Sequence, residues 1–137
     1  MFAYAVFGVA TLMALWMLVK SKAEANSSLF TFHSSLSALD NLVYVGLAFM
    51  TIGMLFGALW AKEAWGHYWS WDPKETWAAI TWFAYLVYVH YRQIPTHRPK
   101  LALWVLLVSF VLLQMCWWGI NYLPSAQGSS VHVYSIE

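Results

Sequence analysis

The sequence predicts an all-α, polytopic integral membrane protein with about four transmembrane helices and a tryptophan-rich segment at the outer membrane face. Of its 137 residues, 61% are hydrophobic and only 9% are charged, whereas a soluble domain carries about a quarter charged residues. Four apolar runs reach about 18 residues, the length that crosses the hydrocarbon core of a bilayer. In lipid each run must be helical, because its backbone polar groups can be paired only within the segment.

The four runs are the elements of one transmembrane domain that covers residues 1–137. They lie at residues 2–19, 42–60, 73–91 and 101–120. The first run is too long and uniform for a signal peptide, and no basic leader precedes it. Asp40 and Asn41 fit the N-cap of the second helix, so residues 21–39 are expected to form a connector with a short interfacial helix.

Basic residues gather in two of the loops and predict the orientation. They follow the first run or separate the third from the fourth: Lys20, Lys22, Arg92, Arg98 and Lys100. By the positive-inside rule these loops are cytoplasmic. The tryptophan-rich segment 61–72 and the C-terminal tail 121–137 then lie together on the outer, periplasmic side of the cell inner (cytoplasmic) membrane.

Charge and cysteine content exclude several classes of protein. The net charge is +1, which gives no electrostatic case for binding nucleic acid. The single cysteine, Cys116, lies in an apolar run and is read as a buried packing thiol. With no CxxCH motif, the chain is not itself a c-type cytochrome.

Residues 72–75 at the centre of the chain predict the start of a helix. Asp72 fits the N-cap, Pro73 fits the first helical position, and Glu75 falls where its side chain reaches back to the cap. Asp72 and Glu75 therefore have a structural role to fill before any chemical one.

Aromatic side chains are unusually dense just before this helix start. Trp65, His67, Tyr68, Trp69 and Trp71 fall within seven residues. One interpretation is the belt of Trp and Tyr that membrane proteins place at the bilayer surface. The other is a π-rich wall for a flat apolar ligand, which explains this density better. Composition alone leaves both interpretations open.

The histidines differ in their surroundings. His90 ends the third run, where an intramembrane histidine indicates a functional site, although a snorkelling interfacial histidine is the alternative. His132 lies in the outer tail, and His67 stands among the tryptophans as a ligand or a hydrogen-bonding wall residue. His33 and His97 lie in loops and are read as solvated. Imidazole is a common axial ligand of haem iron.

These residues carry a resemblance to a known family. The segment WAKEAWGHYWSWDPKETWAAITW closely resembles the tryptophan-rich WWD signature of the haem-handling proteins of cytochrome c biogenesis. Other segments, LDNLVYVGLAFMTIGMLFGALWAKEAWG, YLVYVHYR, WWGINYL and VHVYS, are similar to the CcsA/ResC branch, the System II cytochrome c synthase. The resemblance covers the chain from Asp40 onward and, more weakly, the first run.

The resemblance implies that haem b is carried through the membrane and presented outside to the CxxCH thiols of apocytochrome c. It implies a ResB-like partner subunit or fused domain, and part of a haem lyase type of enzyme. The implied haem-binding residues are Trp65, His67, Trp69, Trp71, Asp72, Trp77, His90 and His132. His90 matches the transmembrane iron ligand after the motif, and His132 matches the outer one. No catalytic residue is singled out.

The chain also departs from the family pattern. The outer histidine before the motif and its transmembrane counterpart have no match here, so we expect the C-terminal part of a larger synthase. Each haem site then has one protein ligand in this chain, and synthase activity of the chain alone is not expected. The alternatives are a haem-binding chaperone or exporter without synthase activity, and an ion or proton transporter using Asp72, Lys74 and Glu75.

Overall fold

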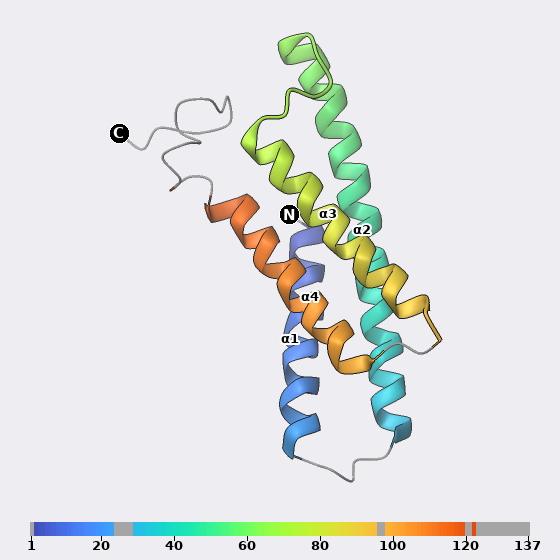
Figure 1. Cartoon of the computed structure of the whole chain (residues 1–137). Helices are drawn as coiled ribbons and strands as arrows, with labels where there is room; N and C mark the ends of the chain where they lie inside the picture. The colour runs from blue at the N-terminus through green and yellow to red at the C-terminus, as the bar shows by residue number, and fades with distance from the viewer. Residues whose placement is uncertain (1, 24–28, 96–97, 120–121, 123–137) are drawn as a thin grey trace.

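A computed structural model describes residues 2–23, 29–95, 98–119 and 122, and shows a helical protein (Figure 1). The helices are α1 (Phe2–Ala23), α2 (Leu29–Trp65), α3 (Pro73–Gln93) and α4 (Pro99–Gln114), and a π-helical turn, Met115–Gly119, follows α4. Within the described ranges there is no strand. The predicted all-α fold is therefore confirmed.

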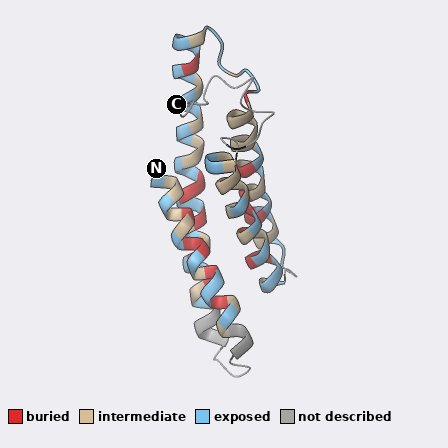
Figure 2. Ribbon diagram, turned by 90° about the vertical axis from the view of Figure 1, so that its left-hand side faces the viewer, coloured by how far each residue is buried: buried red, intermediate tan, exposed pale blue. Residues whose placement is uncertain are grey.

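The four helices form a ring of neighbouring pairs. Helix α1 packs against α2 and α4, while α3 packs against α4 and α2 (Figure 1). With 37 residues, α2 is roughly 55 Å long at 1.5 Å per residue. Its C-terminal part extends past the first residues of α1 and past the start of α3, as Figures 1 and 2 both show.

The core lies where the four helices meet. Apolar residues recur every three or four positions, as a helix buried along one stripe requires. On α1 and α2 they are Phe7, Ala10, Ala14, Met17, Leu36, Leu39, Val43 and Leu47. Phe7 stacks on Tyr85 of α3, with ring centroids 3.8 Å apart and an interplanar angle of 14°. This stack joins the first and third helices at the centre of the bundle.

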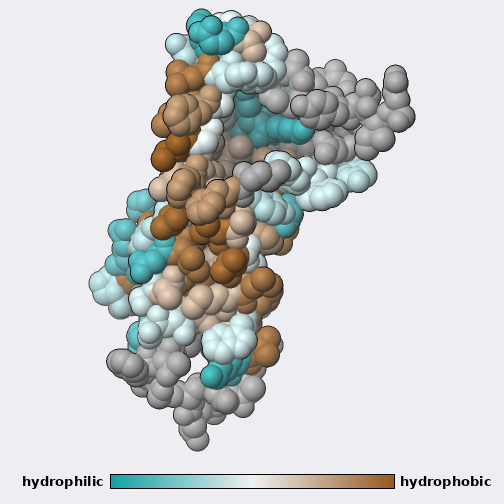
Figure 3. All heavy atoms as spheres, turned by 180° about the vertical axis from the view of Figure 1, so that it is seen from behind, coloured by the Kyte–Doolittle hydropathy of each residue, from teal (hydrophilic) through white to brown (hydrophobic). Residues whose placement is uncertain are grey.

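Three helical stretches are long and apolar enough to cross a membrane. They are Phe2–Lys20, His33–Trp65 and Pro99–Gly119, and apolar side chains gather across the middle of the surface in Figure 3. Helix α3 is less apolar because polar residues interrupt it, beginning with Lys74, Glu75 and Thr76. The protein is a polytopic membrane protein, and the exact membrane boundaries remain a prediction.

The predicted connector before the second span was wrong at its C-terminal end. Helix α2 runs without a break from Leu29 to Trp65, so Asp40 and Asn41 lie inside it and cap nothing. The aromatic segment likewise begins as helix, because residues 61–65 are the last turn of α2. A carboxylate can lie inside a helix when another helix supplies its hydrogen-bond donors.

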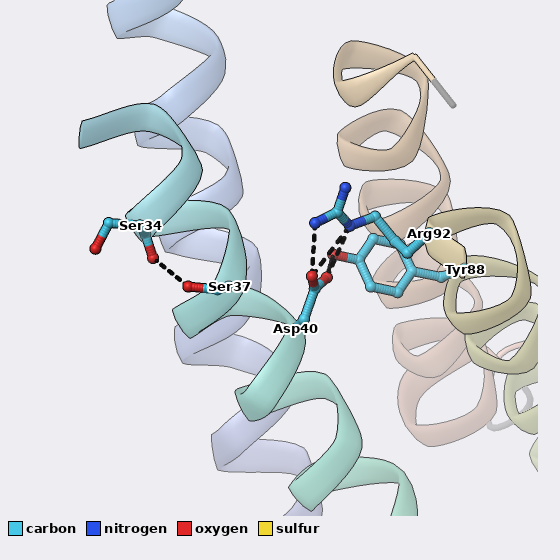
Figure 4. Close-up of polar contacts among 5 residues, drawn as sticks. All are labelled: Ser34, Ser37, Asp40, Tyr88 and Arg92. Atoms are coloured by element: carbon cyan, nitrogen blue, oxygen red, sulfur yellow. Dashed lines mark hydrogen bonds and ion pairs between the residues drawn. The ribbon is translucent and has the colours of Figure 1, made fainter. Parts of the chain in front are cut away.

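Asp40 instead joins α2 to α3 (Figure 4). Its Oδ1 accepts hydrogen bonds from the Tyr88 hydroxyl at 2.8 Å and Arg92 Nε at 2.9 Å, and its Oδ2 accepts one from Arg92 Nη2 at 2.6 Å. The hydrogen bond with Asp40 raises the pKa of the Arg92 guanidinium above its ordinary value. The Asp40 and Arg92 side chains are only 16% and 11% exposed, so this charged pair is largely shielded from water.

Candidate functional site

The start of α3 is fixed by the predicted capping box. The Asp72 side chain accepts a hydrogen bond from the Lys74 backbone N–H at 2.9 Å, and Glu75 accepts one from the Asp72 N–H at 3.3 Å. Pro73 occupies the first turn. Glu75 Oε2 also accepts from the Ser70 N–H at 2.9 Å. The cap therefore orders both the helix and the chain that leads into it.

The link from α2 to α3 is shaped by two residues with positive φ. Gly66 has φ of 82° and donates its N–H to the Lys62 carbonyl at 2.9 Å, which is a left-handed end to α2. Trp71 has φ of 58°, a conformation that is strained for a bulky side chain. Such strain is held by surrounding contacts and is concentrated at functional sites.

Lys62 braces the start of the link. Its Nζ donates to the Gly66 carbonyl at 2.8 Å and lies 5.5 Å from the centroid of the Tyr68 ring. Trp60 and Trp65 meet edge to face at 4.9 Å, and Trp69 and Trp71 do so at 6.0 Å. The indoles thus contact one another in two pairs, one before and one after the left-handed turn at Gly66.

Beside this link lies a half-open cavity of about 790 Å³, which we call the aromatic cavity. This volume is within the range of about 300–1,000 Å³ that is typical of small-molecule and cofactor sites. Its walls come from the C-terminal part of α2, the link, the start of α3 and the π-helical turn. They are Gly53, Met54, Gly57, Ala58, Trp60, Ala61, Trp65, Tyr68, Trp69, Lys74, Glu75, Ala78, Cys116, Trp117 and Trp118.

The chemistry of the walls suits a flat, largely apolar ligand that carries acidic groups. Five indoles and one phenol supply π-faces. Lys74 supplies a positive charge, whereas the Glu75 carboxylate already accepts the hydrogen bonds of the capping box. Trp69 Nε1 is buried and has no acceptor among the described residues. A ligand carboxylate is the kind of group that would complete this donor.

Comparison with known proteins decides the family. The family described as "Cytochrome C assembly protein" matches residues 1–126. This chain belongs to that family.

Relatives named cytochrome c biogenesis protein CcsA agree with this assignment. The protein from Cyanophora paradoxa is 46% identical over 100 residues, which cover 70% of this chain and 30% of the relative. The one from Guillardia theta is 38% identical over 157 residues, covering 98% and 50%. The one from Porphyra purpurea is 45% identical over 103 residues, covering 72% and 31%. The chain thus spans about a third to a half of the length of these relatives.

Only some of the predicted haem-binding residues line the cavity. Trp65 and Trp69 line it, but Trp71, Trp77 and His67 do not. Trp71 is 73% exposed and His67 is exposed. Asp72 is buried in its capping role, as the sequence predicted. A role of Trp71, His67 or Trp77 toward a ligand therefore remains a prediction.

Of the two predicted iron ligands, His90 is the one among the described residues, and it does not line the cavity. His90 is on the last turns of α3, exposed, with Nδ1 2.8 Å from the Leu86 carbonyl oxygen. His132 lies outside the described residues. Within the part of the chain that the structure describes, no three His, Cys, Asp or Glu side chains converge on a possible metal site.

The sequence did not predict several of the wall residues, and two sets of them are informative. Cys116, Trp117 and Trp118 lie on the π-helical turn after α4, a local geometry that is frequent at functional sites. The doubled tryptophan was a signal, but nothing in the sequence places it opposite residues 65–69. The other set is Gly53 and Gly57, whose helical spacing puts both on one face of α2.

Proposed function

We propose that this chain handles haem in cytochrome c assembly. It carries haem through the membrane and presents it at the outer face, where thioether bonds form with the CxxCH cysteines of apocytochrome c. The observation that carries the proposal is the aromatic cavity in a chain of the cytochrome c assembly family. Its indoles suit the porphyrin ring, and Lys74 suits the propionate carboxylates. We propose haem b as the cargo, because its vinyl groups are the partners of the cysteine thiols.

His90 has the hydrogen-bonding pattern of an iron ligand. A carbonyl oxygen only accepts, so the 2.8 Å contact with Leu86 assigns the proton to Nδ1. In the neutral imidazole this tautomer leaves the Nε2 lone pair available, and the bond to Leu86 orients the ring, as the outer hydrogen bond of a metal-bound histidine does. We propose that Nε2 of His90 binds the haem iron at one position and that His132 binds it at another.

The two positions are far apart along α3. Glu75, which lines the cavity, and His90 are fifteen residues apart, or roughly 22 Å at 1.5 Å per residue of helix. This separation supports a path with one haem position toward each side of the membrane. We propose that the cavity and the C-terminal tail face the outer side and that His90 lies toward the cytoplasm, as the basic loops favour.

The residues of this chain position the haem, bind its iron and provide a surface that is poor in water. No catalytic base is assigned. In the attachment reaction each cysteine thiol adds across one haem vinyl group: the S–H bond and the vinyl π bond break, a C–S bond and a C–H bond form, and no co-reactant is consumed. Apocytochrome c is the proposed protein substrate, and a ResB-like subunit or fused domain is the proposed partner. We assign synthase activity to the assembled protein rather than to these residues alone.

An absorption spectrum of the detergent-purified protein tests this proposal. We expect a Soret band when haem is present, in both the oxidised and the reduced state. His90→Ala and His132→Ala should each weaken or shift the band, because each removes one iron ligand. His33→Ala is the matched control, since His33 is an exposed histidine on α2 outside the cavity.

The absence of a Soret band from a protein with a native helical spectrum would contradict the proposal. An unchanged band in both ligand variants would remove the two histidines from the iron. A CxxCH reporter in the same cells separates the alternatives further. Haem binding without covalent attachment to that reporter would favour a haem chaperone or exporter over a synthase.

A further inference from the structure

The face of α2 that lines the aromatic cavity includes two glycines, where the helix backbone itself borders the cavity. Gly53 and Gly57 are one helical turn apart, and Ala61 follows one turn later, all at the cavity wall. A Cβ built on Gly53 or Gly57 would meet no atom within 4 Å. Both residues are inside a regular helix, where glycine is less favourable than alanine. Neither the backbone nor the packing of the described residues therefore calls for glycine at these two positions.

Gly46 on the same helix shows what a packing glycine looks like. A Cβ there would lie 2.6 Å from Phe7 Cε1, and Phe7 is held by its stack on Tyr85. Packing against α1 thus accounts for Gly46 but not for Gly53 and Gly57. The empty space above those two glycines belongs to the cavity itself.

We propose that Gly53 and Gly57 are specificity-determining residues of the cavity: they let a flat macrocycle lie directly against the backbone of α2. The inference rests on the proposed function, in which that macrocycle is the porphyrin ring of haem. Trp65 and Trp69 from the link and Trp117 and Trp118 from the π-helical turn supply the other walls. Any side chain at position 53 or 57 would project into this space and exclude a flat ligand by steric overlap.

A second transmembrane helix is the rival occupant of this face. Small residues four apart are a common contact between helices in membranes. However, the cavity also carries Lys74 and borders Trp69, whose buried Nε1 lacks an acceptor among the described residues. A positive charge and an indole N–H without an acceptor favour a ligand with carboxylates over a second helix, which would present an apolar face here.

Leucine substitutions test the inference in the detergent-purified protein. Gly53→Leu and Gly57→Leu are titrated with haemin and with iron-free protoporphyrin IX, and binding is followed by Soret absorbance and tryptophan quenching. We expect each variant to bind both ligands about tenfold or more weakly than the unmodified protein. The iron-free ligand reports on the fit to the cavity walls, because no histidine ligation contributes to its binding.

Gly8→Leu is the matched control. Gly8 lies on α1 away from the cavity, and a Cβ there also meets nothing within 4 Å. We expect Gly8→Leu to bind both ligands like the unmodified protein. The thermal midpoint of all three variants should stay at or above that of the unmodified protein, so loss of binding cannot be ascribed to unfolding.

The outcomes separate this inference from the proposed function. If the unmodified protein binds haemin and both cavity variants bind it equally well, the inference about Gly53 and Gly57 is wrong and the proposed function stands. If the unmodified protein binds neither ligand, the proposed function fails and the inference fails with it. If the variants keep their affinity but lose association with another subunit, the face is a helix-packing surface and the inference is overturned.

Discussion

Two halves of the longest helix, α2, behave differently although both are apolar. In the packed half, residues 36–47, buried side chains face α1 and Asp40 is bound to α3. In the open half, residues 48–65, only Ala61 is buried (Figure 2). Phe2, the first described residue of α1, meets Phe49 with ring centroids 4.7 Å apart, close to the boundary between the halves. Hydropathy alone does not distinguish a stretch that builds the bundle from one that borders a cavity.

The glycines make the comparison sharper. Gly46 in the packed half makes room for the Phe7 ring. Beside Gly53 and Gly57 in the open half, a Cβ would meet no atom of a described residue within 4 Å. Substitutions in the packed half should therefore change the free energy of unfolding. Substitutions in the open half should change ligand binding and leave stability nearly intact.

The largest effect on stability is expected from Asp40→Ala in the packed half. It removes the acceptor of Tyr88 and Arg92 and leaves a shielded guanidinium without its carboxylate. Breaking a fully buried pair costs about 3–5 kcal/mol. Because Asp40 and Arg92 retain 16% and 11% exposure, we expect a loss of about 2–3 kcal/mol in the free energy of unfolding. SDS titration in mixed micelles, followed by helical circular dichroism, measures it.

A double-mutant cycle tests whether the loss comes from this pair. Asp40→Asn, Arg92→Gln and the double variant are compared in the same titration. We expect the double variant to lose less stability than the sum of the two single variants, because each single variant already breaks the pair. Strictly additive losses would show that the two side chains act independently.

The second effect is expected from Gly46→Ala, also in the packed half. The new Cβ would lie 2.6 Å from Phe7 Cε1, and overpacking of this kind costs about 1–3 kcal/mol. The gain in helix propensity offsets part of that, so we expect a net loss of about 1–2 kcal/mol. Gly57→Ala is the matched control in the open half and should be neutral or stabilising.

Equal effects of the two alanine substitutions would remove the distinction between the halves. A companion variant identifies the cause: Phe7→Leu should cost less stability in the Gly46→Ala background than in the unmodified protein, since there it also relieves the contact with the new methyl group. The same unfolding measurement reports both results.

Local chemistry explains why some features could be predicted from the sequence. The apolar runs predicted the helices, and Asp72, Pro73 and Glu75 predicted the start of α3 because a capping box involves only neighbouring residues. Asp40 had the same capping chemistry available, but it is bound by Tyr88 and Arg92, 48 and 52 residues away. A tertiary contact of that range leaves no periodic signal near Asp40.

The site was predictable only in part for the same reason. Trp65 and Trp69 could be selected because aromatic residues are dense in their own segment. Trp117 and Trp118 reach the cavity through a π-helical turn and through the packing of α4 on α3. Gly53 and Gly57 are informative only once the space beside them is known to be empty. These properties depend on how the helices are arranged, which the spacing of residues does not encode.

The smallest effect on stability is expected at the N-cap of α3, next to Lys74 and Glu75, which line the cavity together with the open half of α2. Asp72→Ala removes the acceptor of the Lys74 N–H, and loss of such a cap costs about 1 kcal/mol. Asp72→Asn keeps an acceptor oxygen at nearly the same place, so it should retain most of that stability. Unfolding titrations compare the two variants, and haemin titrations of the same samples show whether the carboxylate charge acts on the ligand.

If Asp72→Asn is as stable as the unmodified protein yet binds haemin more weakly, Asp72 serves the cavity directly as well as the helix. Unchanged binding in Asp72→Asn, with a modest loss in Asp72→Ala, would assign Asp72 to holding Lys74 and Glu75 at the cavity wall through the start of α3.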